Sequence, residues 1–299
     1  MPSWNEIQNE INGIPSPHDI VRRKYLMRLG EITGRNVIAY YSGWLQHPGS
    51  QMTSITDADK DGFMNAVYRM KKEKGLDLLL HTPGGNLAAT ESIGQYLKEM
   101  FHDDIRCFVP QLAMSGGTML ACCGKSIVMG KESSIGPIDP QLNGIPAHGV
   151  LKEFEEAIDA VSKDPKCLPI WQVIIGKYHP SFIGECRNAM KLSTEIVTKW
   201  LKGGMFANDE NAQKTIKKII SSLNDHSKTK IHARHISAAE AQAMGLKVEM
   251  LEKKGNEELQ DIVLSIHHSY MSLFWSCPCI KVIESDQGKV IMINQGNQP

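Results

Sequence analysis

Short apolar runs alternate with longer segments of helical periodicity through the first half of the chain. The runs have the length of β-strands and begin near residues 36, 76, 105 and 126. Segments between them carry apolar side chains at helical spacing, and residues 17–34 predict another helix before the first strand. Such alternation is typical of βαβ units, so we expect an α/β fold with a mostly parallel, helix-covered sheet.

The helix between the first two strands has a recognisable start. Thr56 or Asp57 is the expected N-cap, because short polar side chains accept hydrogen bonds from the first free amides of a helix. Phe63, Val67 and Met70 then recur at helical spacing and predict its buried face.

The second half of the chain changes character after about residue 164. Prolines punctuate residues 165–180, and long helices are then expected over 182–200 and 208–223, followed by an amphipathic helix over 259–274. Two β-rich runs around a glycine-containing turn, residues 280–285 and 289–293, predict a terminal β-hairpin. We therefore expect a catalytic core over residues 1–165, a helical insertion or arm over 166–230, and completion of the core over 231–299.

A serine stands where one strand turns into a helix. The sequence Met114-Ser115-Gly116-Gly117 follows the strand near residue 105 and opens an apolar helical run. A hydroxyl at that bend lies near the free amides of the helix N-terminus, where partial positive charge favours a developing oxyanion. Ser115 is therefore the candidate nucleophile.

A second glycine loop follows the strand that begins at residue 76. It reads His81-Thr82-Pro83-Gly84-Gly85, and its glycines can turn backbone amides outward to form an anion-binding concavity. Carboxyl ends of parallel strands share one edge of a sheet, so this loop is expected beside Ser115. Gly84, Gly85 and Gly116 are the candidate oxyanion hole, whereas His81 is expected to pack or to line the pocket rather than to act in catalysis.

These motifs resemble those of the serine dehydrogenase proteinase (SDH) family, Clp-fold serine proteases related to signal peptide peptidase A. The resemblance covers roughly residues 76–165 and a second, shorter segment over 236–246. The segments that carry it are His81-Thr82-Pro83-Gly84-Gly85, Ala113-Met114-Ser115-Gly116-Gly117-Thr118-Met119-Leu120-Ala121, Ile127-Val128-Met129-Gly130, and Ser134-Ile135-Gly136-Pro137-Ile138-Asp139-Pro140-Gln141. It implies a ClpP/crotonase-like spiral of ββα units, a serine acyl-enzyme mechanism and a homo-oligomer.

The sequence does not identify by itself which residue acts as the general base for Ser115. Clp-type enzymes carry a histidine in the segment that corresponds to residues 134–140 and, in some cases, an aspartate at the position of Ala233, so a triad in the Clp arrangement is not expected. Relatives of signal peptide peptidase A use a downstream lysine, which favours Lys152 and leaves Lys163 and His148 as alternatives. A lysine base must be desolvated so that its pKa falls from about 10.4. Helical periodicity over 150–161 nevertheless places Lys152 nearly opposite the apolar stripe.

Composition favours an enzyme that binds neither nucleic acid nor membrane. The 33 basic and 33 acidic side chains balance, no segment approaches a bilayer span, and the first residues lack a secretory leader. The seven cysteines are expected as reduced thiols, with adjacent Cys122 and Cys123 a poor disulfide pair and Cys277 and Cys279 too few for a zinc site. No metal, no cofactor and a cytoplasmic location are expected.

Three functions fit these features. The first is a cytoplasmic, ATP-independent serine peptidase that acts on peptides or unfolded proteins through a Ser115–Lys152 dyad, and the chain has no Walker A motif. The second is a crotonase-like acyl-CoA enzyme, for which Glu132 and Asp139 are the nearby acids. The third is an inert peptide-binding protein of the same fold.

Overall fold

A twisted seven-stranded sheet forms the centre of the molecule, seen in a computed structural model that describes residues 4–12, 17–142, 144–224 and 232–296. The strand order is β10-β5-β3-β2-β1-β11-β12, parallel from β10 to β1 and antiparallel through the hairpin β11–β12. The strands of this sheet are β1 (Asn36–Ser42), β2 (Leu76–His81), β3 (Ile105–Val109), β5 (Ser126–Met129), β10 (Val248–Met250), β11 (Cys279–Ser285) and β12 (Val290–Asn294). The predicted parallel sheet and the terminal hairpin are both confirmed.

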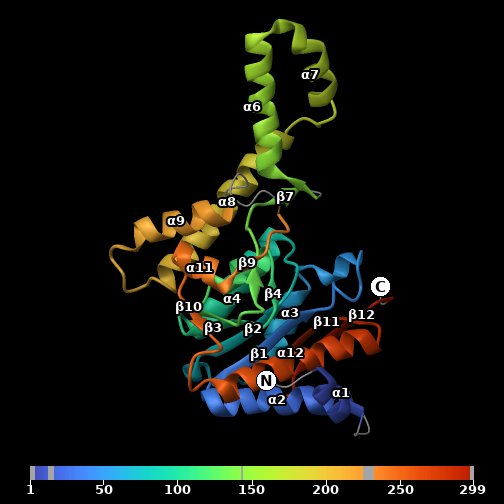
Figure 1. Ribbon diagram of the computed structural model, residues 1–299, viewed down its shortest axis with the longest axis vertical. Helices are drawn as coiled ribbons and strands as arrows, with labels where there is room; N and C mark the ends of the chain where they lie inside the picture. The colour runs from blue at the N-terminus through green and yellow to red at the C-terminus, as the bar shows by residue number, and fades with distance from the viewer. Residues whose placement is uncertain (1–3, 13–16, 143, 225–231, 297–299) are drawn as a thin grey trace.

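Helices cover both faces of this sheet (Figure 1). Leu26 of α2 and Val263 of α12 pack on one face, while Phe63 of α3, Ile93 of α4 and Trp200 of α8 pack on the other. Burial on both faces explains why the central strands are nearly continuous apolar runs. The covering helices are α1 (Trp4–Asn12), α2 (Pro17–Thr33), α3 (Asp59–Val67), α4 (Leu87–Phe101), α5 (Gly116–Ala121), α9 (Ala212–Asn224), α11 (Ala238–Met244) and α12 (Glu257–Ser276).

Three helices build an arm that stands away from the sheet (Figure 1). They are α6 (Ala147–Lys163), α7 (Leu168–Ile175) and α8 (Phe182–Gly203), whose C-terminal half returns to the core. A small apolar cluster of its own, with Val150, Phe182 and Cys186 buried, holds α6 against α8. The first helix of the arm thus starts ahead of residue 166, and the division into three domains stays a prediction.

Two small sheets connect the central sheet to the arm. One has the order β4-β6-β9, with β4 (Leu112–Ala113), β6 (Ser134–Ile135) and β9 (Ile236–Ser237). The other joins β7 (Gln141–Leu142) to β8 (Ile145–Pro146) immediately before α6. The antiparallel pairing of β6 with β9 brings a segment from the last quarter of the chain to the nucleophile region.

The predicted cap of α3 is wrong. The helix begins at Asp59 with Ala58 at the N-cap position and no side-chain cap, and it ends at Val67, so Met70 lies beyond it. The Asp59 carboxylate instead accepts a hydrogen bond from the amide of Thr56 at 2.9 Å and pairs with the buried ammonium of Lys281. The first residue of this helix is thus tied to a strand near the other end of the chain.

All seven cysteines are free, as expected for reduced thiols. Of the described helices, none combines the length and apolar character that a bilayer crossing requires. Within the described residues, no cluster of three or more histidine, cysteine or acidic side chains has a metal-binding arrangement.

Candidate active site

Ser115 lies in a strained turn between β4 and α5. Its backbone has φ 50° and ψ −114°, a region that side chains other than glycine rarely occupy. Such a conformation costs about 1–3 kcal/mol and persists only where surrounding structure enforces it. The side chain is half-buried and lines a cavity, so the hydroxyl is presented to the space in which a substrate would bind.

The glycine loop after β2 lies directly against this turn. A Cβ placed on Gly84, which has φ 91°, would stand 2.7 Å from both the amide nitrogen of Gly116 and the Cβ of Ser115. A Cβ on Gly116 would lie 3.4 Å from the amide nitrogen of Gly85. Only glycine permits this approach, which places the amides of Gly85 and Gly116 side by side.

Those two amides are available to an incoming oxyanion. Among the described residues, neither the Gly85 nor the Gly116 amide donates to an acceptor, whereas the amide of Gly84 donates to Thr82 Oγ1 at 3.2 Å. Gly85 and Gly116 therefore supply the donors of the candidate oxyanion hole, and Gly84 supplies the close backbone approach.

Backbone hydrogen bonds hold the two glycine motifs in register. The amide of Thr82 donates to the Leu112 carbonyl at 3.1 Å, and the amide of Met114 donates back to the Thr82 carbonyl at 2.9 Å. On the other side, the amide of Ile55 donates to the Gly84 carbonyl at 2.8 Å. The loop and the nucleophile turn are thus one rigid unit before any substrate arrives.

A histidine that the sequence analysis did not consider is paired with an acid beside this unit. Nδ1 of His232 lies 2.9 Å from Oδ1 of Asp139, whose side chain is 1% exposed. Asp139 stands between Ile138 and Pro140, and both of these neighbours line the cavity in front of Ser115. The pairing of β6 with β9 brings the two partners together.

The sequence carries a signal for this pair. Asp139 lies in the segment where Clp-type enzymes carry their histidine, and His232 is adjacent to Ala233, where some of them carry an aspartate. In this chain the acid thus stands in the first of these segments and the histidine beside the second, so residue types alone, taken in either order, would have indicated the pair.

The structure places the three sequence-predicted bases on the arm. Lys152 has 64% of its side chain exposed, and its ammonium lies 3.4 Å from Glu156 on the same helix. His148 is half-buried in the first turn of α6, and Lys163 is the last residue of that helix and exposed. Lys152 thus lacks, within one copy of the chain, the desolvated surroundings that a lysine base needs.

His81 is fully buried behind the glycine loop rather than facing the cavity. Among the described residues, neither of its ring nitrogens has a hydrogen-bond partner, and it packs against Trp44, Tyr41 and His267. Burial and the neighbouring His267 hold the pKa of His81 well below its usual value. It is a neutral core histidine, consistent with a packing role.

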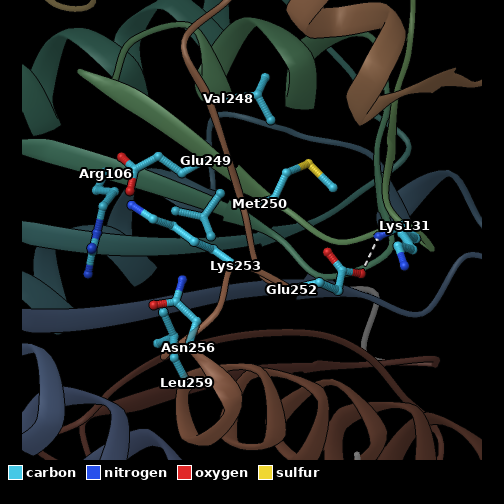
Figure 2. Close-up of a pocket in the computed structure, with 10 residues that line it drawn as sticks. Arg106, Lys131, Val248, Glu249, Met250, Glu252, Lys253, Asn256 and Leu259 are labelled. Atoms are coloured by element: carbon cyan, nitrogen blue, oxygen red, sulfur yellow. Dashed lines mark hydrogen bonds between the residues drawn. The ribbon is translucent and has the colours of Figure 1, made fainter.

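A larger hollow of about 670 Å³ lies away from Ser115, at the β10 edge of the sheet (Figure 2). Figure 2 shows Arg106, Lys253 and Glu249 among the lining side chains and the amide of Lys131 bonded to Glu252, a hydrogen bond of 2.7 Å. Its lining mixes both signs of charge and contains no hydroxyl or thiol nucleophile. The glycine loops, not this hollow, form the candidate active site.

Comparisons with known proteins identify relatives of this chain. Two uncharacterized proteins of Methanocaldococcus jannaschii are similar: MJ0137 is 38% identical over 102 residues, 34% of this chain and 35% of the relative. MJ1495 is 30% identical over 172 residues, 58% of this chain and 53% of the relative. The matches thus span about a third and about half of the length of these relatives.

One similar solved structure is the membrane-bound stomatin-specific protease 1510-N. It has a TM-score of 0.41 and 16% identity, and the match covers 69% of this chain and 79% of that one. The model of the ClpP-like SDH-type serine proteinase family matches residues 19–262, a span that includes both glycine loops, Ser115, Asp139 and His232. The chain belongs to this ClpP-like family of SDH-type serine proteinases.

Proposed function

We propose that the protein is a serine peptidase that cleaves peptide bonds through an acyl-enzyme on Ser115. One observation carries the proposal: a hydroxyl on a strained turn stands beside two backbone amides that donate to nothing else in the described chain. Such preorganised donors stabilise the negative charge of a tetrahedral intermediate and contribute much of the rate of acyl transfer.

His232 is the proposed general base, and Asp139 orients it. If Nδ1 carries the proton donated to Asp139, Nε2 is the acceptor nitrogen, and the proposal assigns the serine proton to that nitrogen once substrate is bound. A carboxylate that is 1% exposed also stabilises the imidazolium once the proton has moved. Lys152 is 64% exposed and lies beside Glu156, so it lacks the desolvation that a lysine base needs, and the Ser115–Lys152 dyad is the competing proposal.

The proposed reaction has two halves. Ser115 Oγ forms a bond to the carbonyl carbon as its proton passes to the base, and the carbonyl oxygen becomes an oxyanion held by the Gly85 and Gly116 amides. Collapse of this intermediate breaks the C–N bond, and the base returns its proton to the departing amine. Water then attacks the ester by the same steps, which releases the acid and restores the serine.

The setting of this activity is also a proposal. We take the substrate to be a peptide or an unfolded protein segment, because an open cavity in front of Ser115 would receive an extended chain. We take cleavage to be independent of ATP, because the chain has no Walker A motif. Seven free cysteines support a reducing compartment such as the cytoplasm. Ile170 and Val173, which are 65% and 67% exposed on α7, support a homo-oligomer joined through the arm.

Labelling with a small fluorophosphonate, read by peptide mass spectrometry, tests the proposal. We expect an adduct on Ser115 that is absent from Ser115→Ala and forms roughly 100- to 10,000-fold more slowly in His232→Asn, the range for loss of a general base. His235→Asn is the matched control, because His235 is exposed and lies three residues away.

The outcomes separate the alternatives. Normal labelling of His232→Asn with loss in Lys152→Ala would move the base to Lys152, and dependence on neither would move it to His148 or Lys163. Absence of any adduct on the folded wild-type protein would contradict a peptidase. Binding of an acyl-CoA would then favour the crotonase-like enzyme, and binding of intact peptides would favour the inert peptide-binding protein.

A further inference from the structure

The cavity in front of Ser115 is lined by apolar and uncharged polar side chains. Its volume is about 400 Å³, and it extends from the glycine loop across to the arm. Among the described residues, no acidic, basic or histidine side chain belongs to its lining, and the polar side chains there are those of Asn86, Ser115, Gln141 and Asn188. The apolar side chains among the lining residues are Leu87, Ala88, Met119, Ile138, Pro140, Leu142, Ala189 and Leu192.

One wall of this cavity is a single face of α8. Asn188, Ala189 and Leu192 stand within about one turn of each other and face the glycine loop across the cavity. Ala189 is half-buried, and its small side chain leaves the space open, whereas Leu192 is 37% exposed. Helix α8 therefore contributes both the width of the cavity and the apolar character of that side.

The wall is held rigidly relative to Ser115. The hydroxyl of Ser193, which is fully buried, donates to the Ile138 carbonyl at 2.9 Å, and Ile138 itself lines the cavity. Further along α8, Trp200 is 1% exposed and packs so closely on Gly94 of α4 that a Cβ there would stand 2.4 Å from its ring. A wall anchored in this way can discriminate between side chains by size.

We propose that Ala189 and Leu192 determine substrate specificity, and that this cavity accepts an uncharged apolar side chain of the residue that acylates Ser115. The inference rests on the proposed peptidase function and adds the substrate class to it. A charged side chain would lose hydration in the cavity without meeting an opposite charge among the described lining residues, and a bulky one would need the space that Ala189 leaves open.

Peptidyl diphenyl phosphonates test this inference without requiring turnover. The Oγ of Ser115 forms a bond to phosphorus, phenoxide leaves, and the serine proton passes to the base. The probes differ only in the side chain next to phosphorus, which is that of alanine, leucine, lysine or glutamate. Adduct formation on Ser115 is timed by mass spectrometry, and the small fluorophosphonate measures the intrinsic reactivity of the serine in each variant.

In the wild-type protein the leucine probe is expected to react at least about tenfold faster than the lysine or glutamate probe. Ala189→Phe fills the cavity and lowers the leucine-to-alanine rate ratio by about tenfold or more. Leu192→Lys introduces a charge at the wall and raises the glutamate rate relative to the leucine rate. The two variants change selectivity in different directions, which general misfolding would not do.

Lys191→Ala is the matched control, because Lys191 lies on the same helix with 75% of its side chain exposed and pairs only with Glu195 at 3.8 Å within the described residues. It should leave all ratios unchanged. The fluorophosphonate could still label Ser115 while the rate ratios stay the same in both cavity variants. That result would overturn the specificity inference and leave the proposed peptidase function standing. Failure of every probe to label Ser115 would overturn both.

Discussion

His232 and Asp139 are joined by a 2.9 Å hydrogen bond although 93 residues separate them in the chain. The contact exists because β9, just after His232, pairs with β6, just before Asp139. In the proposed mechanism this contact orients His232 as the general base. Its loss therefore provides the first test of the proposed mechanism.

Asp139→Asn and His232→Asn should each slow fluorophosphonate labelling of Ser115 by about 100-fold or more, and the double variant should be hardly slower than either alone. Residues that act as one unit are non-additive in this way. Second-order labelling rates of the three variants provide the measurement. Additive losses would show that the two side chains act independently and would contradict the proposed orientation of His232 by Asp139.

Gly84→Ala should abolish labelling and lower the free energy of unfolding. Its Cβ would stand 2.7 Å from the Gly116 amide in a backbone with φ 91°, so the loop must move away from Ser115. Gly34→Ala is the control, because Gly34 has φ 66° and nothing within 4 Å of its Cβ position. It should cost only backbone strain, about 1–2 kcal/mol by urea unfolding, and leave labelling unchanged. Equal effects of the two variants on labelling would exclude a close-approach role for Gly84.

Lys281→Met should lower the free energy of unfolding by about 3–5 kcal/mol, because it leaves the Asp59 carboxylate buried without its ammonium partner. Both side chains are almost fully buried, at 1% and 0% exposure. Replacing both, as in Asp59→Leu with Lys281→Met, should cost less than the single change. Urea unfolding of both variants checks this order. A double variant with a lower free energy of unfolding than Lys281→Met would contradict it.

The protein should lose stability as the pH falls below about 6.5, in part because two buried histidines must stay neutral. Burial lowers the pKa of His267 to about 3, and the neighbouring His268 adds to this shift. Burial also lowers the pKa of His81, and the neighbouring His267 adds to that shift. Groups whose pKa is lower in the folded state contribute stability above the unfolded pKa and lose it toward the folded pKa. At pH 5 the free energy of unfolding should be about 2 kcal/mol lower because of His267, and His81 should lower it further in the same direction.

The measurement compares urea unfolding at pH 7.5 and pH 5 for wild type, His81→Phe and His267→Phe. Each variant should show a smaller loss of unfolding free energy at pH 5 than the wild type. His179→Gln is the control, since His179 is exposed on the arm and its removal should leave the pH dependence as it is. Identical pH profiles in all four proteins would show that neither buried histidine titrates as described.

Ile170→Glu combined with Val173→Glu should convert an oligomer into smaller species, because both side chains protrude from the tip of the arm. Light scattering after size-exclusion chromatography checks the mass at several concentrations. Lys166→Glu, an exposed change next to α7, controls for the added charge. An unchanged mass of the double variant would place the contact between copies elsewhere.

Much of the core could be predicted because its determinants are local. Alternating apolar runs predicted the parallel strands β1, β2, β3 and β5, and the glycine-containing turn predicted the β11–β12 hairpin. The family match confirms the ClpP-like α/β fold inferred from the glycine motifs. The free amides of Gly85 and Gly116 follow from turn chemistry encoded within a few residues on either side.

The N-cap of α3 shows where local rules stop. Thr56 and Asp57 have the side chains that caps require, yet the helix starts at Asp59 and neither of them caps it. The Asp59 carboxylate pairs with Lys281 of β11, a partner far away in the chain. No window of sequence around residue 56 contains that information.

The sequence by itself determined the strand–turn–helix around Ser115, the glycine loop after β2 and the positions of the strands β1, β2, β3 and β5 in the chain, because backbone preference and apolar periodicity act over a few residues. Only the tertiary structure decided which acid meets which histidine, that Lys152 stands exposed on an arm, and that Ala189 and Leu192 face the nucleophile. These relationships depend on packing between distant segments, whose free energy appears only when the whole chain has folded.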